Sequence, residues 1–219
     1  MIHSLEVDSV ILEFEQKRVL QDVFLKNETG KTTGLLGRNG TGKTCLMRII
    51  YGELKTTNKS IRLDGKVIFD GFRNPNTLRY LPQFSFIPGN LKIKRIFNDF
   101  NLNFSEFIEY FPGFEKYYNF KLRSLSGGEC RIVEIYSVLA SNTKFCMLDE
   151  PFTKVMPVHV DTIKSIIKDE KKNKGIIITD HLYEHIIDIC DEIYVITNGK
   201  TYLTKDKSDL KKLGYINKN

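Results

Sequence analysis

The chain has 219 residues, a formal net charge of +6 and 41% hydrophobic residues, a composition typical of a soluble globular protein. No apolar run approaches the roughly 20 residues needed to cross a bilayer, and the start shows no basic and apolar stretch of a signal peptide. We therefore expect a cytoplasmic protein. The cysteines are scattered without a C-x-x-C pair, which argues against a zinc site or a disulfide framework and predicts buried free thiols at Cys45, Cys130, Cys146 and Cys190.

The positive charge is not arranged as a nucleic-acid footprint. Residues 168–174 and 205–218 mix charges of both signs, as solvated helix ends do. No basic stripe carries interleaved aromatic residues, which argues against a nucleic-acid partner. A mild attraction to anionic lipid head groups, or to a partner at a membrane, fits the charge equally well.

The first part of the chain is typical of short strands around one helix. Apolar runs, turn residues and an Asp-Gly pair predict strands at 9–14, 19–26, 32–36 and 78–81, a turn at 27–31, a helix at 45–51 and a hairpin at 61–69.

From about residue 84 to residue 121 the pattern changes to short segments rich in Phe, Tyr and Ile. Two short helices with aromatic inner faces are predicted at 93–100 and 105–111. We expect a helical subdomain at about 84–125 with a small core of its own, inserted into one domain whose other parts are 1–83 and 126–219.

The last part alternates helices and apolar strands. Ile132, Ile135, Tyr136 and Leu139 share one face of a helix, and Pro157 opens another helix with Val160, Ile163 and Ile167 on its inner face. Strands are predicted at 145–148, 175–179 and 193–197. Apolar strands that alternate with helices indicate an α/β domain with a largely parallel sheet.

The strongest motif follows the strand at 32–36 and fits G-x-x-x-x-G-K-[ST]. Its glycines let backbone N–H groups surround phosphate oxygens at a helix N-terminus. Lys43 is suited to the outer phosphates, and the hydroxyl of Thr44 is suited to Mg²⁺. The motif therefore predicts a nucleotide site at Gly37, Arg38, Asn39, Gly40, Thr41, Gly42, Lys43 and Thr44.

Two acids end the strand at 145–148. Asp149 and Glu150 lie where phosphate-binding loops gather in parallel sheets. One of them is suited to holding Mg²⁺, and the other to polarising a water aimed at the γ-phosphate. His181 follows another strand and is expected beyond the same sheet edge; Gln83 carries a weaker signal.

The segment Leu125-Ser126-Gly127-Gly128-Glu129 has two interpretations. Ser126 and Glu129 fit a capping box that opens the following helix. The capping box leaves two glycines in the first turn unexplained, because each costs about 1 kcal/mol in a helix. They are reasonable where a phosphate approaches the helix end.

Together these motifs resemble those of the ATP-binding cassette (ABC) ATPases, from Phe14 to about Gly199. The resemblance rests on the phosphate loop, Leu-Pro-Gln, Leu-Ser-Gly-Gly-Glu, Asp-Glu-Pro and Thr-Asp-His, in that order. It implies a phosphate-loop NTPase (RecA-like) α/β core with an N-terminal antiparallel β subdomain and an inserted helical subdomain. The implied ligands are ATP and Mg²⁺.

The resemblance also implies a role for each matching residue. Phe14 would stack on adenine, and Gln83 would sense Mg²⁺ and the partner domain. Asp149 would be the Mg²⁺-associated acid with Thr44, Glu150 the general base and His181 the γ-phosphate sensor. The signature, Ser126, Gly127, Gly128 and Glu129, would bind the ATP held by another subunit.

These roles imply a homodimer or paired cassettes that close on two ATP molecules. The leading hypothesis is the ATPase subunit of an ABC transporter, held at the inner face of the cell membrane by integral-membrane subunits. One alternative is a soluble ABC ATPase acting on nucleic acid or the ribosome. Another is a non-hydrolysing regulatory cassette, suggested by Met156 where the family usually has Asp. Cys130, where a Gln often follows the signature, is a smaller departure.

Overall fold

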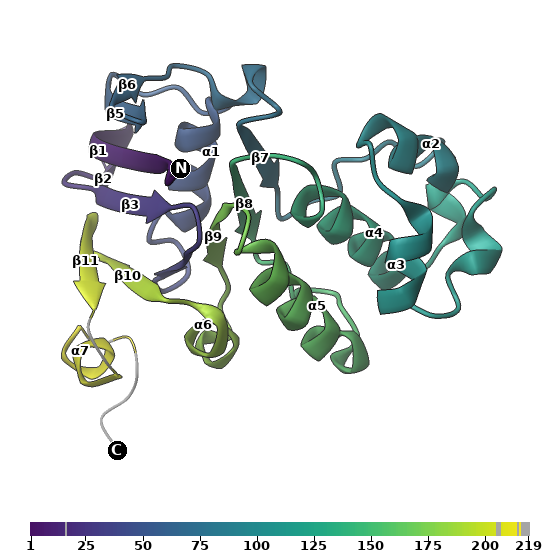
Figure 1. Cartoon of the computed structure of the whole chain (residues 1–219). Coiled ribbons are helices and arrows are strands. Elements are labelled where there is room, and N and C mark those ends of the chain that lie inside the picture. The colour runs from purple at the N-terminus through teal and green to yellow at the C-terminus, as the bar shows by residue number, and fades with distance from the viewer. Residues whose placement is uncertain (16, 205–206, 214, 216–219) are drawn as a thin grey trace.

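The computed structural model describes residues 1–15, 17–204, 207–213 and 215, and it is an α/β fold built on two sheets (Figure 1). The larger sheet has the strand order β11-β10-β4-β9-β8-β7, with every neighbouring pair parallel except β10 and β11. Its strands are β4 (Thr32–Leu36), β7 (Leu78–Leu81), β8 (Phe145–Asp149), β9 (Gly175–Thr179), β10 (Glu192–Thr197) and β11 (Lys200–Thr204). The predicted parallel core sheet is confirmed.

The second sheet is antiparallel and comes from the N-terminal part of the chain. Its strands are β1 (Ser4–Phe14), β2 (Lys17–Leu20), β3 (Phe24–Glu28), β5 (Asn58–Leu63) and β6 (Lys66–Val67). The predicted Asp-Gly turn is confirmed, since Asp64 and Gly65 have φ of 50° and 76°, as a two-residue hairpin turn requires.

The single strand predicted at 19–26 is wrong. The chain turns between β2 and β3, where the amide of Gln21 donates a hydrogen bond of 2.9 Å to the carbonyl of Gly199. The strands β2 and β3 then pair with different parts of β1. Pairing across the fold outweighs the local apolar run.

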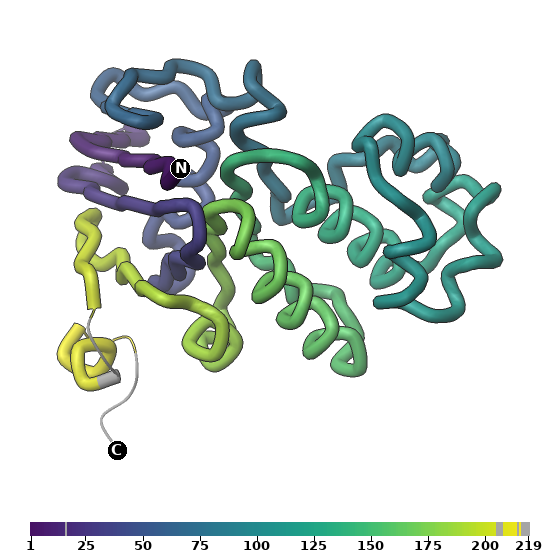
Figure 2. Tube along the Cα trace, in the orientation of Figure 1, coloured from purple at the N-terminus to yellow at the C-terminus, as the bar shows by residue number. Residues whose placement is uncertain are grey.

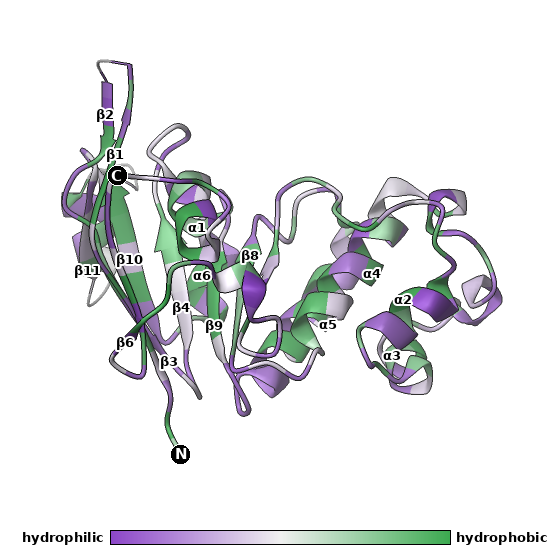
Figure 3. Ribbon diagram, turned by 90° about the horizontal axis from the view of Figure 1, so that it is seen from above, coloured by the Kyte–Doolittle hydropathy of each residue, from purple (hydrophilic) through white to green (hydrophobic). Residues whose placement is uncertain are grey.

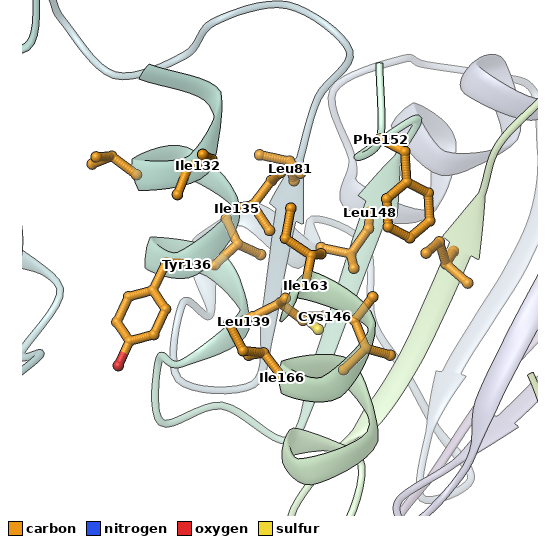
Figure 4. Close-up of a cluster of buried hydrophobic side chains, with 14 of the residues drawn as sticks. Leu81, Ile132, Ile135, Tyr136, Leu139, Cys146, Leu148, Phe152, Ile163 and Ile166 are labelled. Atoms are coloured by element: carbon orange, nitrogen blue, oxygen red, sulfur yellow. The ribbon is translucent and has the colours of Figure 1, made fainter. Parts of the chain in front are cut away.

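Helices cover both faces of the parallel sheet. On one side, α1 (Lys43–Tyr51) lies between the two sheets; on the other side lie α4 (Gly127–Leu139), α5 (Pro157–Glu170) and α6 (Tyr183–Ile189). Alternate residues of β8 separate the two hydrophobic clusters, since Cys146 and Leu148 pack with α4 and α5 (Figure 4) whereas Phe145 and Met147 pack with α1. The C-terminal helix is α7 (Lys207–Lys212).

Residues 84–125 lie at one end of the molecule and the β1–β2 hairpin at the other (Figures 1 and 3). The trace leaves the sheet after β7, forms α2 (Ile93–Asp99) and α3 (Phe104–Tyr110), and returns through α4 to β8 (Figure 2). Short 3-10 turns occupy 71–73, 115–117 and 122–124. The aromatic residues of this region do not form a separate core, because the ring of Phe107 lies 4.9 Å from that of Tyr136 on α4.

The shared face of Ile132, Ile135, Tyr136 and Leu139 on α4 is confirmed, and the other residues from Arg131 to Leu139 are buried as well. The expectation on the cysteines needs correction. All four cysteines are free, but only Cys146 is a buried residue, and burial raises the pKa of its thiol to about 12. Cys45, Cys130 and Cys190 are half-buried residues. None of the described helices combines the length and the hydrophobicity of a membrane span.

Candidate nucleotide site

The carboxyl ends of four neighbouring parallel strands bring the predicted motifs to one edge of the sheet. The phosphate loop follows β4, His181 follows β9, Glu150 follows β8 and Gln83 follows β7. A cavity of about 620 Å³ lies there. Its lining consists of Phe14, Val19, Asn39, Gly40, Gly42, Lys43, Thr44, Cys45, Gln83, Glu150 and His181.

The loop ends by forming the N-terminus of α1. Gly42 is the N-cap residue, and its φ of 101° is a conformation that residues with a side chain rarely adopt. Because glycine has no side chain, it offers no acceptor to the first N–H groups of the helix. The first turn of α1 also lacks an acidic residue. These N–H groups and the helix dipole thus favour an anion at the cavity.

Lys43 lies within the loop and is almost completely buried, with 6% exposure. Its ammonium donates hydrogen bonds of 2.7 Å and 3.3 Å to the carbonyls of Gly37 and Arg38. Burial lowers the pKa of Lys43, and the carboxylate of Glu150 opposes this shift. The cavity therefore contains a positive charge that lacks the full solvation of water, which strengthens its attraction for phosphate.

Asp149 is fully buried behind the cavity and connects three elements. Its carboxylate accepts hydrogen bonds of 3.3 Å from Thr44 on α1 and 2.9 Å from Tyr80 on β7. Burial raises the pKa of Asp149, although these two hydroxyls favour its charged form.

Glu150 lies at the centre of the site. Its Oε2 accepts a hydrogen bond of 2.8 Å from the amide of Gln83 and lies 3.8 Å from Nδ1 of His181. The hydroxyl of Thr153 donates to the same oxygen at 3.4 Å. The φ of Glu150 is 49°, a left-handed conformation that is uncommon for a non-glycine residue.

The capping box at the signature is confirmed. The amide of Glu129 donates to Ser126 Oγ at 3.3 Å, and the amide of Ser126 donates to the Glu129 carboxylate at 2.8 Å. Packing within the chain explains the glycine at 128, because a Cβ there would lie 2.9 Å from the carbonyl oxygen of Lys154. A Cβ on Gly127 would meet nothing within 4 Å, so no packing in the described chain requires this glycine.

The structure thus gathers most of the predicted site residues but not all of them. The signature does not line the cavity, nor do Gly37, Arg38, Thr41 and Asp149. Sequence reasoning missed Val19 and Cys45 on the cavity wall and Tyr80 behind it. Their only sequence signal is proximity to Phe14, the loop and Gln83.

Known proteins resemble this chain over most of its length. A family model described as ABC transporter matches residues 20–153. The "Lipopolysaccharide export system ATP-binding protein LptB" of Haemophilus influenzae is 33% identical over 216 residues, which cover 91% of this chain and 89% of that protein. The protein of the same name from Escherichia coli K12 is 32% identical over 202 residues, which cover 85% and 83%.

Solved structures share the fold. One described as "Structure of ATP binding subunit of ABC transporter" superposes with a TM-score of 0.81 at 20% identity, covering 96% of this chain and 93% of that one. The chain therefore belongs to the ABC transporter family and is an ATP-hydrolysing cassette subunit.

Proposed function

We propose that two cassettes close head to tail around ATP, and that hydrolysis drives separate integral-membrane subunits. The observation that carries this proposal is the position of the signature. Ser126 to Glu129 do not line the cavity of their own chain, and Gly127 is open. The open position at Gly127 leaves the first turn of α4 accessible to a phosphate presented by another subunit.

We assign the binding roles from the cavity. The half-exposed ring of Phe14 lines the cavity and would stack on adenine. Lys43 and the N–H groups of residues 37–44 would hold the phosphates, and His181 would contact the γ-phosphate. The signature residues Ser126, Gly127, Gly128 and Glu129 would complete the site of the second cassette.

The residues fit a Mg²⁺ ion that arrives with the nucleotide. Among the described residues, no group of three His, Cys, Asp or Glu side chains could hold a metal ion by itself. Mg²⁺ usually combines one or two protein oxygens with substrate phosphates, and Thr44, Asp149 and Gln83 supply such groups. When bound, the ion would neutralise charge that develops on the phosphates.

Hydrolysis requires a base beside the γ-phosphate. We propose that Glu150 accepts a proton from a water whose oxygen forms the new bond to the γ-phosphorus. The bond to the leaving oxygen of ADP then breaks and its electron pair stays on ADP. Glu150 lies next to Gln83 and His181, so all three can respond to the same phosphate.

We also propose that residues 84–125 form the helical signature subdomain of the cassette, with 1–83 and 126–219 as its nucleotide-binding core. The membrane subunits would hold the chain at the inner face of the membrane. Several relatives are named for lipopolysaccharide export, which makes lipopolysaccharide the first cargo to test.

Affinity purification of the chain from detergent-solubilised membranes tests the partner. We expect an integral-membrane protein to co-purify and to raise the ATPase rate after reconstitution. Recovery of ribosomes or DNA in its place would contradict the transporter assignment.

A further inference from the structure

We infer that Arg131 and Glu134 on α4 are positioning residues for hydrolysis, because they hold the chain on both sides of Gln83 and the backbone of Glu150. This inference rests on the roles proposed above for those two residues. It extends the proposed function, since it links the signature helix to the general base within one chain.

The guanidinium of Arg131 connects the two loops of the site. It donates hydrogen bonds of 2.8 Å to the carbonyl of Pro82 and 3.0 Å to that of Asp149. A third hydrogen bond, of 3.3 Å, reaches the carbonyl of Glu150. One side chain therefore fixes the peptide before Gln83 and both carbonyls of the acidic pair.

Glu134 lies one turn further along α4 and holds the rest of the loop that contains Gln83. Its Oε1 accepts the hydroxyl of Ser85 and the amides of Phe86 and Ile87, at 3.0 Å and 3.4 Å for the two amides. Its Oε2 lies 3.5 Å from Arg131. The loop is thus attached to α4 on both sides of Gln83.

Both charges are buried, with 4% exposure for Arg131 and 1% for Glu134. Buried ion pairs give little net stability, since desolvation cancels most of their attraction. What distinguishes Arg131 and Glu134 is that both form hydrogen bonds with main-chain groups of the loops after β7 and β8. Glu150 also has a left-handed φ of 49°, and such a conformation persists only where surrounding contacts determine it.

The link between the signature and these two loops is short and runs along one helix. Helix α4 begins at the signature, where Ser126 caps it, and Arg131 follows within two turns. Figure 4 shows Ile132 and Ile135 of the same helix packed beside Leu81 of β7 and Leu148 of β8. A shift of the signature helix on contact with a second cassette would therefore move Gln83 and Glu150 together.

Arg131→Lys tests the inference, because it keeps the positive charge beside Glu134 but replaces a planar fork of donors with one nitrogen. We expect kcat for ATP hydrolysis to fall at least tenfold. The KM for ATP and the Kd of a fluorescent ATP analogue should stay within twofold, since neither residue lines the cavity.

The opposite end of α4 provides a matched control. Lys174 is also buried, donates to the carbonyls of Leu139 and Ser141, and pairs with Glu170 at 2.8 Å. Lys174→Arg should lower the thermal unfolding midpoint without lowering kcat per folded molecule. An equal loss of kcat in both variants would overturn the inference, because the effect would then come from general stability.

An unchanged kcat in Arg131→Lys would also overturn the inference. Should that variant fail to fold, Glu134→Gln takes its place, with an expected loss of about threefold in kcat at constant KM; unchanged kcat has the same meaning. Glu150→Gln separates the positioning role of Arg131 and Glu134 from the proposed role of Glu150 as the base. Full activity in that variant contradicts the proposed base itself, whatever Arg131 does.

Discussion

The side-chain amide of Gln83 donates a hydrogen bond of 2.8 Å to the carboxylate of Glu150, joining the ends of β7 and β8 across the candidate site. The two residues are 67 positions apart in the chain. The pair meets because the strand order places β7 beside β8 and aligns their carboxyl ends. A movement of the loop after β7 would therefore change the hydrogen bond to Glu150, the proposed base.

Phe14 should contribute to nucleotide affinity through stacking. We expect Phe14→Ala to weaken binding of a fluorescent ATP analogue about tenfold, since stacking of a base on an aromatic ring is worth about 1–3 kcal/mol. Phe24→Ala is the matched control, because Phe24 has 47% exposure against 49% for Phe14 but does not line the cavity. Equal affinities of the two variants would argue against stacking at Phe14.

The two signature glycines should respond differently to alanine. Gly127→Ala places its methyl group in open space, so we expect the folded chain to keep its stability or gain up to about 1 kcal/mol from helix propensity. Its ATPase rate should nevertheless fall at least tenfold. Gly128→Ala should lower stability, because its methyl group meets the carbonyl of Lys154. Urea unfolding and ATPase assays measure both effects, and full activity of Gly127→Ala would contradict the role of that open helix end.

Asp149 should destabilise the nucleotide-free chain at neutral pH. Burial raises its pKa, so the folded chain binds this proton more tightly than the unfolded chain does. Protonated Asp149 therefore contributes stability at low pH. This stability is lost as the pH rises from 3.8, the ordinary pKa of the carboxyl group, through its raised pKa in the folded chain. Asp149→Asn should therefore raise the thermal unfolding midpoint at pH 8 by roughly 2–4 °C, and by less as the pH falls toward 4. A gain that is the same at every pH would contradict the assigned cause.

Met156 occupies the N-cap position of α5 without a side-chain cap, and 51% of it is exposed. An Asp there would accept a hydrogen bond from the first turn, so Met156→Asp should raise the free energy of unfolding by about 1 kcal/mol. Met156→Ala is the control without an acceptor. Equal stability of the two variants in urea would rule out the capping effect.

The ATP dependence of hydrolysis in Met156→Asp also measures whether this carboxylate increases coupling between two ATP sites.

The sequence predicted those parts of the site that depend on local patterns. The phosphate loop, the acids after β8 and His181 after β9 each follow a short buried strand, and parallel strands bring such ends together. The pairing of residues 17–28 with separate parts of β1 had no local signal.

Contacts between distant segments were equally invisible in the sequence. Arg131 and Glu134 lie among apolar residues of α4, and their partners are main-chain groups of loops far along the chain. The contact between Gly128 and Lys154 depends on the same tertiary packing. The sequence therefore predicts the catalytic and binding residues at the carboxyl edge of the sheet better than the tertiary contacts that hold them.

In the proposed dimer, one chain carries half of each ATP site. Glu150→Gln keeps the cavity but removes the proposed base, so ATP should persist and hold two chains together. Light scattering after gel filtration with ATP should give twice the 25.4 kDa mass of one chain, and the single-chain mass with ADP. Adding Lys43→Ala should restore the single-chain mass in ATP. A Glu150→Gln chain that binds ATP yet remains at 25.4 kDa would contradict this shared ATP site.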